Sequence, residues 1–277
     1  MKAIVSDMIG TVHLKPNSFS ERDNEAFYGE SVEVLEEHIL GYYKVRLHYR
    51  HEGWMPKGQL STNERKNENW YPLPKRMVSH HFADVLEKPN VRGRLLVELT
   101  KGCVLAVNGE AENGWQPVRL LNGNEGFIRE VFLRELPGMP DFSKEAELRG
   151  RLVSEALSYM GTQYRWGGKS PLGIDCSGLC AMALMLNGIV VFNGLVMLDR
   201  IRQNLAPPLR EIHLESVKTG DLIYWPGHVA MYLDEGKFVH SSSSKNGVVI
   251  NSLRPGDDDY DERLVSGIIG AASIFGN

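Results

Sequence analysis

The sequence has few cysteines, and their spacing fits neither a disulfide framework nor a metal site. Its 277 residues contain three of them, Cys103, Cys176 and Cys180. An odd count leaves at least one thiol unpaired, and no Cys/His spacing matches a zinc finger. The acidic run at 257–259 is typical of a solvated loop rather than of a metal site. The sequence therefore predicts at least one free thiol and no bound metal.

Long apolar runs and basic runs are also missing. No stretch approaches the roughly 18 apolar residues of a membrane span, and residues 1–7 lack the apolar region of a secretory signal. The net charge of −4 disfavours nucleic acid as the main ligand. These absences predict a cytoplasmic protein without a membrane span, while an exported form that has lost its leader stays an alternative.

The length predicts two or three domains, and the first half of the chain contains an internal repeat. Segments within residues 12–55 recur 73 positions later, within residues 85–128. The matched segments are Val12-x-x-Lys15-Pro16-Asn17 with Val85-x-x-Lys88-Pro89-Asn90, Val45-Arg46-Leu47 with Val118-Arg119-Leu120, and Glu52-Gly53-Trp54-Met55 with Glu125-Gly126-Phe127-Ile128. One offset shared by so many positions indicates two copies of one structural unit.

Each copy is expected to be a small all-β unit. Residues 31–36 alternate polar and apolar side chains, as a half-buried strand does. Units of this size and pattern resemble bacterial SH3-like barrels, which act either as spacers or as modules that bind cell-wall material or border a catalytic cleft. We expect barrels at 1–61 and 83–137, joined by a polar connector at 62–82.

The pattern changes to helix after Pro137-Gly138. Ser143 is a candidate N-cap, and Gly161 follows the last expected turn. The apolar residues that recur at helical spacing are Leu148, Leu152, Ala156 and Met160. We therefore expect a helix with one buried face at the start of a mixed α and β domain over residues 141–277.

Cys176 is the candidate nucleophile. It begins a segment, 176–187, whose apolar residues recur at helical spacing. Unpaired backbone N–H groups at a helix start favour a thiolate over a thiol, and they can face an oxyanion during acyl transfer. The alternative is a buried apolar cysteine, which fits Cys180 better because it lies one turn inside the helix. Asp175 and Ser177 are either helix caps or substrate contacts.

Two histidines are candidates for the base and its orienter. The segments around them predict a hairpin with the loop 234–236, where glycine suits the left-handed position. In the register that pairs Leu233 with Lys237, His228 and His240 become diagonal neighbours on one face. One histidine on a strand is more often structural, but two on one face downstream of a helix-start cysteine predict a nucleophile, a base and an orienter. A one-residue change of register would separate them.

Five motifs in order give the third domain a family resemblance. They are Tyr164-x-Trp166-Gly167-Gly168, Asp175-Cys176-Ser177-Gly178-Leu179, Leu186-Asn187-Gly188-Ile189, Gly220-Asp221-Leu222-Ile223-Tyr224-Trp225, and His228-Val229-Ala230-Met231-Tyr232-Leu233 with Phe238-Val239-His240 after it. Residues 143–270 resemble the NlpC-type bacterial cell-wall cysteine peptidases. That resemblance implies a papain-like α+β core that uses no metal or other cofactor. With two SH3-like modules ahead of it, the chain is similar to the subgroup called dipeptidyl-peptidase six.

The resemblance also implies roles for single residues. Cys176 corresponds to the nucleophile, His228 to the base and His240 to the polar orienter. The residues that correspond to oxyanion or substrate contacts are Tyr164, Asp175, Ser177, Asp199 and Glu30. Asp199 corresponds only in part, because its segment lacks the family's arginine and follows an apparent insertion after Ile189, which puts the wall of the specificity pocket in doubt.

The implied reaction is hydrolysis of the γ-D-glutamyl–L-diamino acid bond in free peptidoglycan peptides, during murein peptide recycling. The peptides are L-Ala-γ-D-Glu-Lys or its diaminopimelate analogue, with a free N-terminus. One alternative is an exported endopeptidase that acts on intact peptidoglycan with the barrels as wall anchors. Another is a non-catalytic wall-binding protein. The sequence decides neither the preferred diamino acid nor the oligomeric state.

Overall fold

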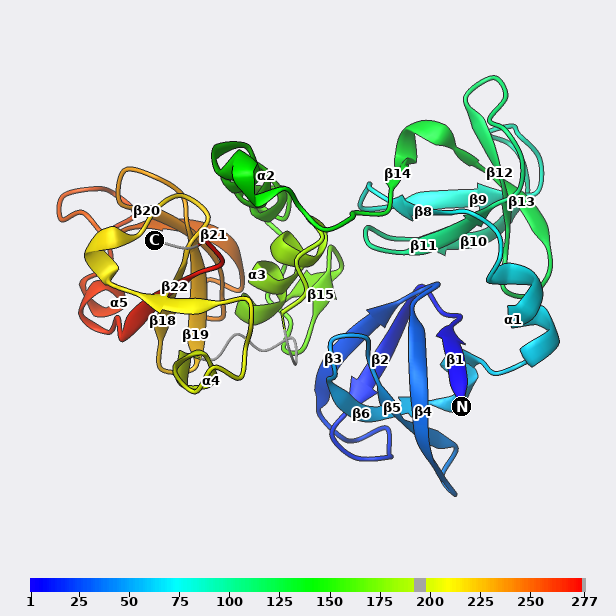
Figure 1. The fold of residues 1–277 in the computed structure, drawn as a ribbon, viewed down its shortest axis with the longest axis horizontal. Helices are drawn as coiled ribbons and strands as arrows, with labels where there is room; N and C mark the ends of the chain where they lie inside the picture. The colour runs from blue at the N-terminus through cyan, green and yellow to red at the C-terminus, as the bar shows by residue number, and fades with distance from the viewer. Residues whose placement is uncertain (192–197, 276–277) are drawn as a thin grey trace. The chain divides into compact units, whose positions relative to one another are not determined.

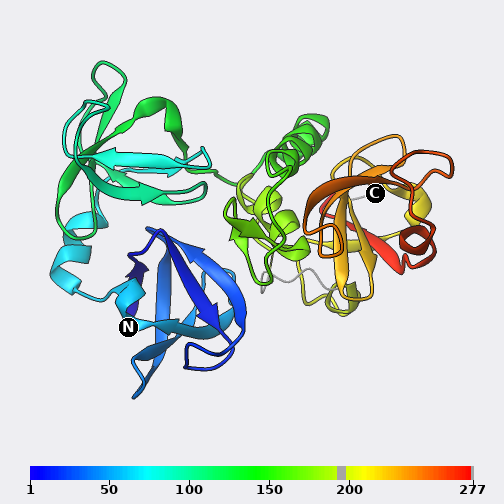
Figure 2. The same ribbon diagram turned by 180° about the vertical axis from the view of Figure 1, so that it is seen from behind.

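The structure, a computed structural model, describes residues 1–191 and 198–275. The chain divides into two compact units, one made of Met1–His48 with Glu52–Leu136 and the other of Tyr49–His51 with Pro137–Asn277. Figure 1 shows the fold and Figure 2 shows it from behind. Among the described residues, no helix has the length and apolar character needed to cross a membrane.

The first unit contains two antiparallel sheets, each of seven strands in the described part of the chain. The strands of the first sheet are β1 (Lys2–Val5), β2 (Ile9–His13), β3 (Arg22–Phe27), β4 (Ser31–His38), β5 (Tyr42–Arg46), β6 (Glu52–Pro56) and β7 (Leu60–Ser61), with the 3-10 turn η1 (Lys57–Gln59). The strands of the second sheet are β8 (Lys75–Val78), β9 (Ala83–Leu86), β10 (Leu95–Leu99), β11 (Val104–Val107), β12 (Trp115–Arg119), β13 (Glu125–Arg129) and β14 (Leu133–Glu135), with the 3-10 turn η2 (Glu130–Phe132).

The two sheets have the same topology, which confirms the internal repeat. Their strand orders are β3-β2-β6-β5-β4-β1-β7 and β10-β9-β13-β12-β11-β8-β14, so each strand corresponds to the one seven places later. Gly29 and Gly102, one repeat apart, both adopt a positive φ, of +84° and +96°, in the left-handed region that favours glycine. Val45 and Val118 are fully buried at equivalent positions. The repeated residues are therefore those that form the turns and the cores of two SH3-like barrels.

The expected connector at 62–82 includes the first strand of the second barrel. It contains the helix α1 (Glu64–Trp70) and the strand β8. Strand β8 pairs with β11 and β14, and Val78 is fully buried. The second barrel therefore begins at β8 and not at residue 83. The polar residues and the prolines Pro72 and Pro74 around this short strand concealed it in the sequence.

The second unit is a mixed α+β domain, as expected. Its strands are β15 (Lys169–Ser170), β16 (Gly173–Ile174), β17 (Arg210–Ile212), β18 (Leu222–Trp225), β19 (His228–Tyr232), β20 (Lys237–Ser242), β21 (Gly247–Ser252) and β22 (Gly270–Ser273). Its helices and 3-10 turns are η3 (Phe142–Lys144), α2 (Glu145–Leu157), α3 (Cys176–Met185), α4 (Leu198–Arg202), η4 (Leu214–Ser216) and α5 (Glu262–Ser266).

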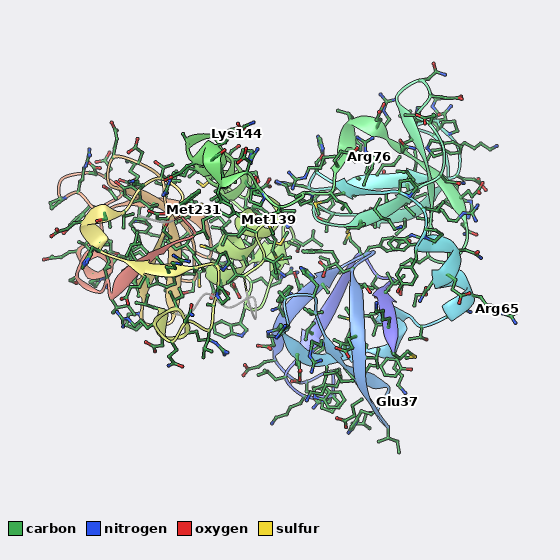
Figure 3. The ribbon with its side chains drawn as sticks, in the orientation of Figure 1. Glu37, Arg65, Arg76, Met139, Lys144 and Met231 are labelled. Carbon is green, nitrogen blue, oxygen red and sulfur yellow. The ribbon has the colours of Figure 1, made fainter. Side chains whose placement is uncertain are left out.

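The core of the second unit lies between its antiparallel sheet and two helices. The sheet order is β17-β22-β18-β19-β20-β21, and α3 packs on β19 and β20 while α2 packs on α3 and β19. Met231 on β19, labelled in Figure 3, is fully buried. Most residues of α3 are buried, as expected of a helix that is apolar on all sides. This packing fixes the start of α3 against the strands that carry the histidines.

Helix α2 has the predicted buried face but different ends. Leu148, Leu152 and Ala156 are fully buried, as predicted. The predicted cap at Ser143 is wrong, because Asp141 accepts a hydrogen bond from the Ser143 N–H and precedes a 3-10 turn. The prediction for Met160 is also wrong, since the helix ends at Leu157 and the Met160 side chain, outside the helical phase, is 45 % exposed.

Candidate active site

Asp175 caps the helix that carries Cys176. Its Oδ1 accepts hydrogen bonds from the Gly178 N–H at 2.6 Å and from the Ser177 hydroxyl at 2.7 Å. Its Oδ2 accepts the Gly167 N–H at 2.8 Å. The carboxylate thereby satisfies N–H groups at the helix start that have no partner within the helix. The capping interpretation of Asp175 is confirmed.

Two glycines allow the loop before the helix to lie against its first turn. A Cβ atom on Gly178 would lie 2.2 Å from the backbone oxygen of Gly168, and a Cβ on Gly168 would lie 2.4 Å from the backbone oxygen of Gly173. Neither position has room for a larger side chain. The close approach places the segment that begins at Tyr164 beside Cys176, and it explains the glycines of two of the five motifs.

Cys176 is the first residue of α3 and is mostly buried. The backbone N–H groups of Val229, Ser177 and Cys176 itself lie near enough to the sulfur to lower its pKa. Since Val229 directly follows His228, this contact joins the start of α3 to the start of β19. Cys180, one turn further along, is fully buried, as predicted for an apolar cysteine.

The thiolate expected at the helix start is contradicted by the electrostatics of the site. Burial raises the pKa of the Cys176 thiol to about 11, and the negative charge of Asp175 adds to the increase. The three N–H groups lower the pKa by less than these two effects raise it. Cys176 therefore carries its proton at neutral pH, and a base must remove that proton when the sulfur attacks.

The two histidines lie where the sequence places them. Strand β19 pairs with β20 in the predicted register, with Met231 opposite Val239 and Tyr232 opposite Phe238. The His228 Nε2 and His240 Nδ1 atoms are 2.7 Å apart. The predicted juxtaposition of the two imidazoles is confirmed.

Both imidazoles are neutral at neutral pH. Burial, with a smaller contribution from the charge of His240, lowers the pKa of His228 to about 4. Burial also lowers the pKa of His240, against a smaller opposing effect of its hydrogen bond to Asn251. A neutral thiol and a neutral imidazole make a general-base pair and not a preformed ion pair.

We expect the alkylation of Cys176 by iodoacetamide to accelerate with pH across the neutral range. Only the thiolate is alkylated, and far below a pKa of about 11 its fraction grows about tenfold per pH unit. The measurement is the inactivation rate between pH 6 and pH 9, with the labelled residue identified by mass spectrometry. A rate that reaches a plateau above pH 5, together with a thiolate absorbance at about 240 nm that is absent in Cys176→Ala, would show a preformed ion pair and would contradict the neutral site.

Asn251 forms a hydrogen bond with His240, and the sequence did not predict this contact. Its Oδ1 lies 3.0 Å from His240 Nε2, and its Nδ2 donates to the backbone oxygen of Asp259 at 2.6 Å. Strand β21 pairs with β20 so that Val249 lies opposite His240. Extending the hairpin register to this third strand would have placed Asn251 diagonally beside His240.

Tyr164 lies near the nucleophile, as predicted. Residue 164 forms a parallel bridge with Ile174, two residues before Cys176. Burial raises the pKa of Tyr164 to about 12, and the charges of Cys176 and Asp175 contribute to the increase. The hydroxyl therefore stays protonated and can donate a hydrogen bond.

Of two further residues singled out in the sequence, Asp199 lies away from this group and Glu30 belongs to the other unit. Asp199 is on α4, which packs on β17 and β22 at the sheet edge opposite β20 and β21. Its side chain is 81 % exposed and lies 3.9 Å from Arg202. Glu30 belongs to the first unit, where its mostly buried carboxylate is 3.7 Å from His48. The apparent insertion after Ile189 runs into residues 192–197, which lie outside the described residues.

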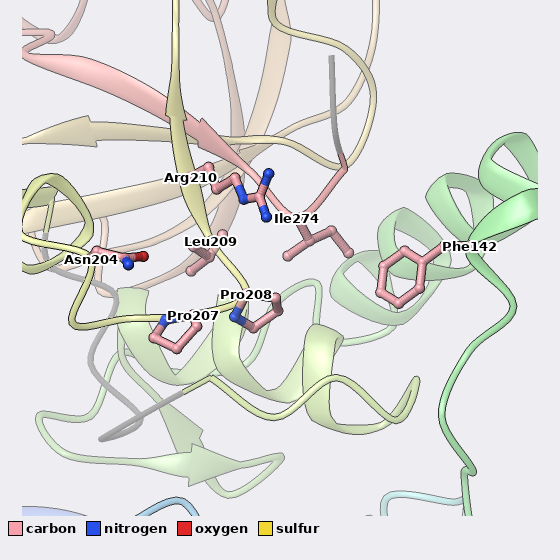
Figure 4. A pocket seen from close by; sticks show the side chains of 7 residues that line it. All are labelled: Phe142, Asn204, Pro207, Pro208, Leu209, Arg210 and Ile274. Atoms are coloured by element: carbon pink, nitrogen blue, oxygen red, sulfur yellow. The ribbon is translucent and has the colours of Figure 1, made fainter.

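A separate pocket of about 460 Å³ lies in the second unit. Its lining residues are Phe142, Asn204, Pro207, Pro208, Leu209, Arg210 and Ile274 (Figure 4). The lining is mainly apolar, with Arg210 as its charged side chain. It contains neither Cys176 nor either histidine, so the pocket is not the catalytic centre.

Comparison with known proteins gives matches over both units. Residues 161–263 match the NlpC/P60 family. The chain is 35 % identical over 278 residues to a protein of Lysinibacillus sphaericus named dipeptidyl-peptidase 6, with 99 % of this chain and 100 % of the relative covered. It is 26 % identical to the gamma-D-glutamyl-L-lysine dipeptidyl-peptidase of Bacillus cereus, with 81 % of this chain and 66 % of that protein covered.

A solved structure has the same fold along the whole chain. The crystal structure of an NlpC/P60 family protein from Bacillus cereus superimposes with a TM-score of 0.78, and the alignment covers 100 % of both chains. The sequence identity is 20 %. This likeness shows that the two chains share a fold.

Proposed function

The chain belongs to the NlpC/P60 family, and we propose that it is a cysteine peptidase that hydrolyses the γ-D-glutamyl–L-diamino acid bond of free peptidoglycan peptides. The observation that carries the proposal is the match to dipeptidyl-peptidase 6, which extends over both barrels and the catalytic domain. Relatives that share only the catalytic domain do not support this substrate so directly. The arrangement of the Cys176 thiol with the imidazoles of His228 and His240 supports hydrolysis through a covalent intermediate on the cysteine.

In the proposed first half-reaction, Cys176 attacks the γ-carbonyl carbon of D-glutamate. Its thiol proton moves to a ring nitrogen of His228 as the carbon–sulfur bond forms, because the neutral thiol is a weak nucleophile. The negative charge moves to the carbonyl oxygen. Backbone N–H groups at the start of α3 and the protonated Tyr164 hydroxyl are the donors available to that oxyanion.

The tetrahedral intermediate then collapses to a thioester. The carbon–nitrogen bond breaks, and His228 returns the proton to the departing α-amino group of the diamino acid. In the second half-reaction His228 removes a proton from a water molecule that attacks the thioester. The carbon–sulfur bond breaks, His228 returns the proton to the departing sulfur, and the L-Ala-γ-D-Glu dipeptide leaves with the Cys176 thiol restored. Water is the only reactant besides the peptide, and no atom is oxidised or reduced.

We also propose that the site recognises the free amine of L-alanine. Asp175 is next to the nucleophile, and its Oδ2 has one hydrogen bond, from Gly167, among the described contacts. A carboxylate oxygen can accept a second donor, and an ammonium group makes a strong charge-assisted one. The role of Glu30 as a substrate contact stays a prediction. Ser177 would act indirectly, since its hydroxyl holds Asp175.

We expect acetylation of the substrate amine to lower kcat/KM by about 10- to 100-fold. The acetyl group removes the positive charge and leaves a buried carboxylate without a cationic partner, which costs about 1–3 kcal/mol. The measurement is kcat/KM for L-Ala-γ-D-Glu-L-Lys, for its N-acetylated form and for a muramyl-linked form. The diaminopimelate peptide, assayed beside them, determines the preferred diamino acid.

The same assay separates the alternatives for the whole protein. Comparable kcat/KM values for the three lysine peptides would contradict amine recognition, and release of peptides from intact sacculi would then favour an enzyme of the exported type. Absence of turnover on every substrate would favour a wall-binding protein. We propose action in the cytoplasm, which cell fractionation tests separately.

A further inference from the structure

Three polar side chains form a diagonal line across three neighbouring strands. His228 is on β19, His240 on β20 and Asn251 on β21. His240 lies opposite Val249, so Asn251 is displaced by two residues toward the C-terminal end of β21. The register of β19 and β20 displaces His228 by two residues toward the N-terminal end of β19. Diagonal neighbours on one face are within reach of each other's side chains.

The orientation of the Asn251 amide is fixed by the backbone. The carbonyl oxygen of Asp259 can only accept a hydrogen bond, so the amide nitrogen of Asn251 must face it, at 2.6 Å. The Asp259 side chain is in turn paired with Lys237, with atoms 3.0 Å apart, which holds this loop against β20. The amide oxygen of Asn251 is therefore directed at His240 Nε2, at 3.0 Å.

This orientation determines where the protons of both imidazoles lie. An amide oxygen cannot donate, so His240 Nε2 must carry the hydrogen. A neutral His240 then has a bare Nδ1, which accepts a hydrogen bond from His228 Nε2 at 2.7 Å. A neutral His228 with its hydrogen on Nε2 has a bare Nδ1. That bare nitrogen is the one that can take a proton from the thiol.

We propose that Asn251 is a positioning residue that holds His240 and, through it, His228 in the Nε2–H form required of the base. The inference rests on the proposed cysteine-peptidase function and adds a fourth residue to the site of Cys176, His228 and His240. Asn251 touches neither the nucleophile nor, in this account, the substrate. In the opposite tautomer, His228 would carry a hydrogen on Nδ1 and could not accept the thiol proton. Asn251 on β21 thus determines the tautomer of the base, although the side chains of His240 and His228 stand between it and Cys176.

The first test is a measurement on the full chain with ¹⁵N-labelled histidine. Ring-nitrogen chemical shifts distinguish the two neutral tautomers, and spectra of the His228→Ala and His240→Asn variants assign the signals. At neutral pH we expect both His228 and His240 in the Nε2–H form. A wild-type protein with His240 in the Nδ1–H form would overturn the proposal, and this result requires no Asn251 variant to fold.

The second test removes the acceptor with little change in volume. In Asn251→Leu we expect the uniform Nε2–H population of both histidines to be lost. We expect kcat to fall by about 10- to 100-fold while KM stays within about twofold, because the binding groups are untouched. A folded Asn251→Leu variant with unchanged tautomers would contradict the assignment.

Asn187 provides a matched control. Its amide donates to the Ala183 backbone oxygen at 2.9 Å, at the end of α3 opposite Cys176. Asn187→Leu therefore makes the same change of side chain away from Asn251, His240 and His228. We expect wild-type tautomers and wild-type kcat. The ring-nitrogen shifts need no substrate, so failure of this inference is separable from failure of the proposed function. Correct tautomers without cleavage of any peptide would refute the function alone.

Discussion

Replacing Cys176 with alanine should lower kcat/KM for L-Ala-γ-D-Glu-L-Lys by about 10⁴-fold or more. The sulfur is the atom that forms the covalent bond in the proposed mechanism, and no neighbouring group can substitute for it. Asp175 is already occupied as the helix cap, and Tyr164 is held in its protonated form by burial. The measurement is steady-state hydrolysis by purified wild-type and variant protein.

Cys180→Ala is the matched control for this substitution. Cys180 is on the same helix, one turn inside, and is fully buried. It should lower the melting temperature without a large change in kcat, since no substrate atom can reach it. Cys103→Ser in the second barrel should likewise leave kcat unchanged. Turnover near the wild-type rate in Cys176→Ala, or its loss in folded Cys180→Ala, would refute Cys176 as the nucleophile.

His228→Ala should lower kcat by about 10²–10⁴-fold, whereas His240→Asn should cost only about tenfold. His228 takes and returns a proton in both half-reactions. His240 acts through His228, and an asparagine oxygen at position 240 can still accept the His228 Nε2 hydrogen. The measurement is kcat for both variants at neutral pH, with KM determined in parallel.

His213→Ala serves as the control for loss of an imidazole in the same unit. His213 is exposed and precedes the 3-10 turn η4, so its removal should leave kcat unchanged. Equally mild effects of His228→Ala and His240→Asn would mean that the two histidines do not act as base and orienter. Equally severe effects would mean that His240 takes part in proton transfer itself.

The sequence predicted those features that depend on local spacing. The offset of 73 residues identified two copies of one barrel because the glycines and apolar core residues recur at fixed positions. The hairpin register followed from the short loop with Gly236 in a left-handed conformation, and it placed the two histidines together. A two-residue period leaves little freedom once one pair is fixed.

The features that the sequence did not predict depend on tertiary environment. The thiolate expected from the helix start is absent because burial and Asp175 raise the pKa of Cys176 more than the backbone N–H groups lower it. Asn251 was missed because its role depends on the register of a third strand and on the backbone of Asp259. Strand β8 was missed because four residues between polar segments carry little periodicity.

The most direct test of the account is product analysis of L-Ala-γ-D-Glu-L-Lys after incubation with wild-type protein and with Cys176→Ala. Mass spectrometry of the wild-type digest should identify two products, the dipeptide L-Ala-γ-D-Glu and free lysine. It should also detect the dipeptide as a thioester on the Cys176 peptide in samples quenched with acid, and the variant should leave the substrate intact. Release of alanine instead, or cleavage of the same bond by Cys176→Ala, would contradict the proposed reaction and its nucleophile.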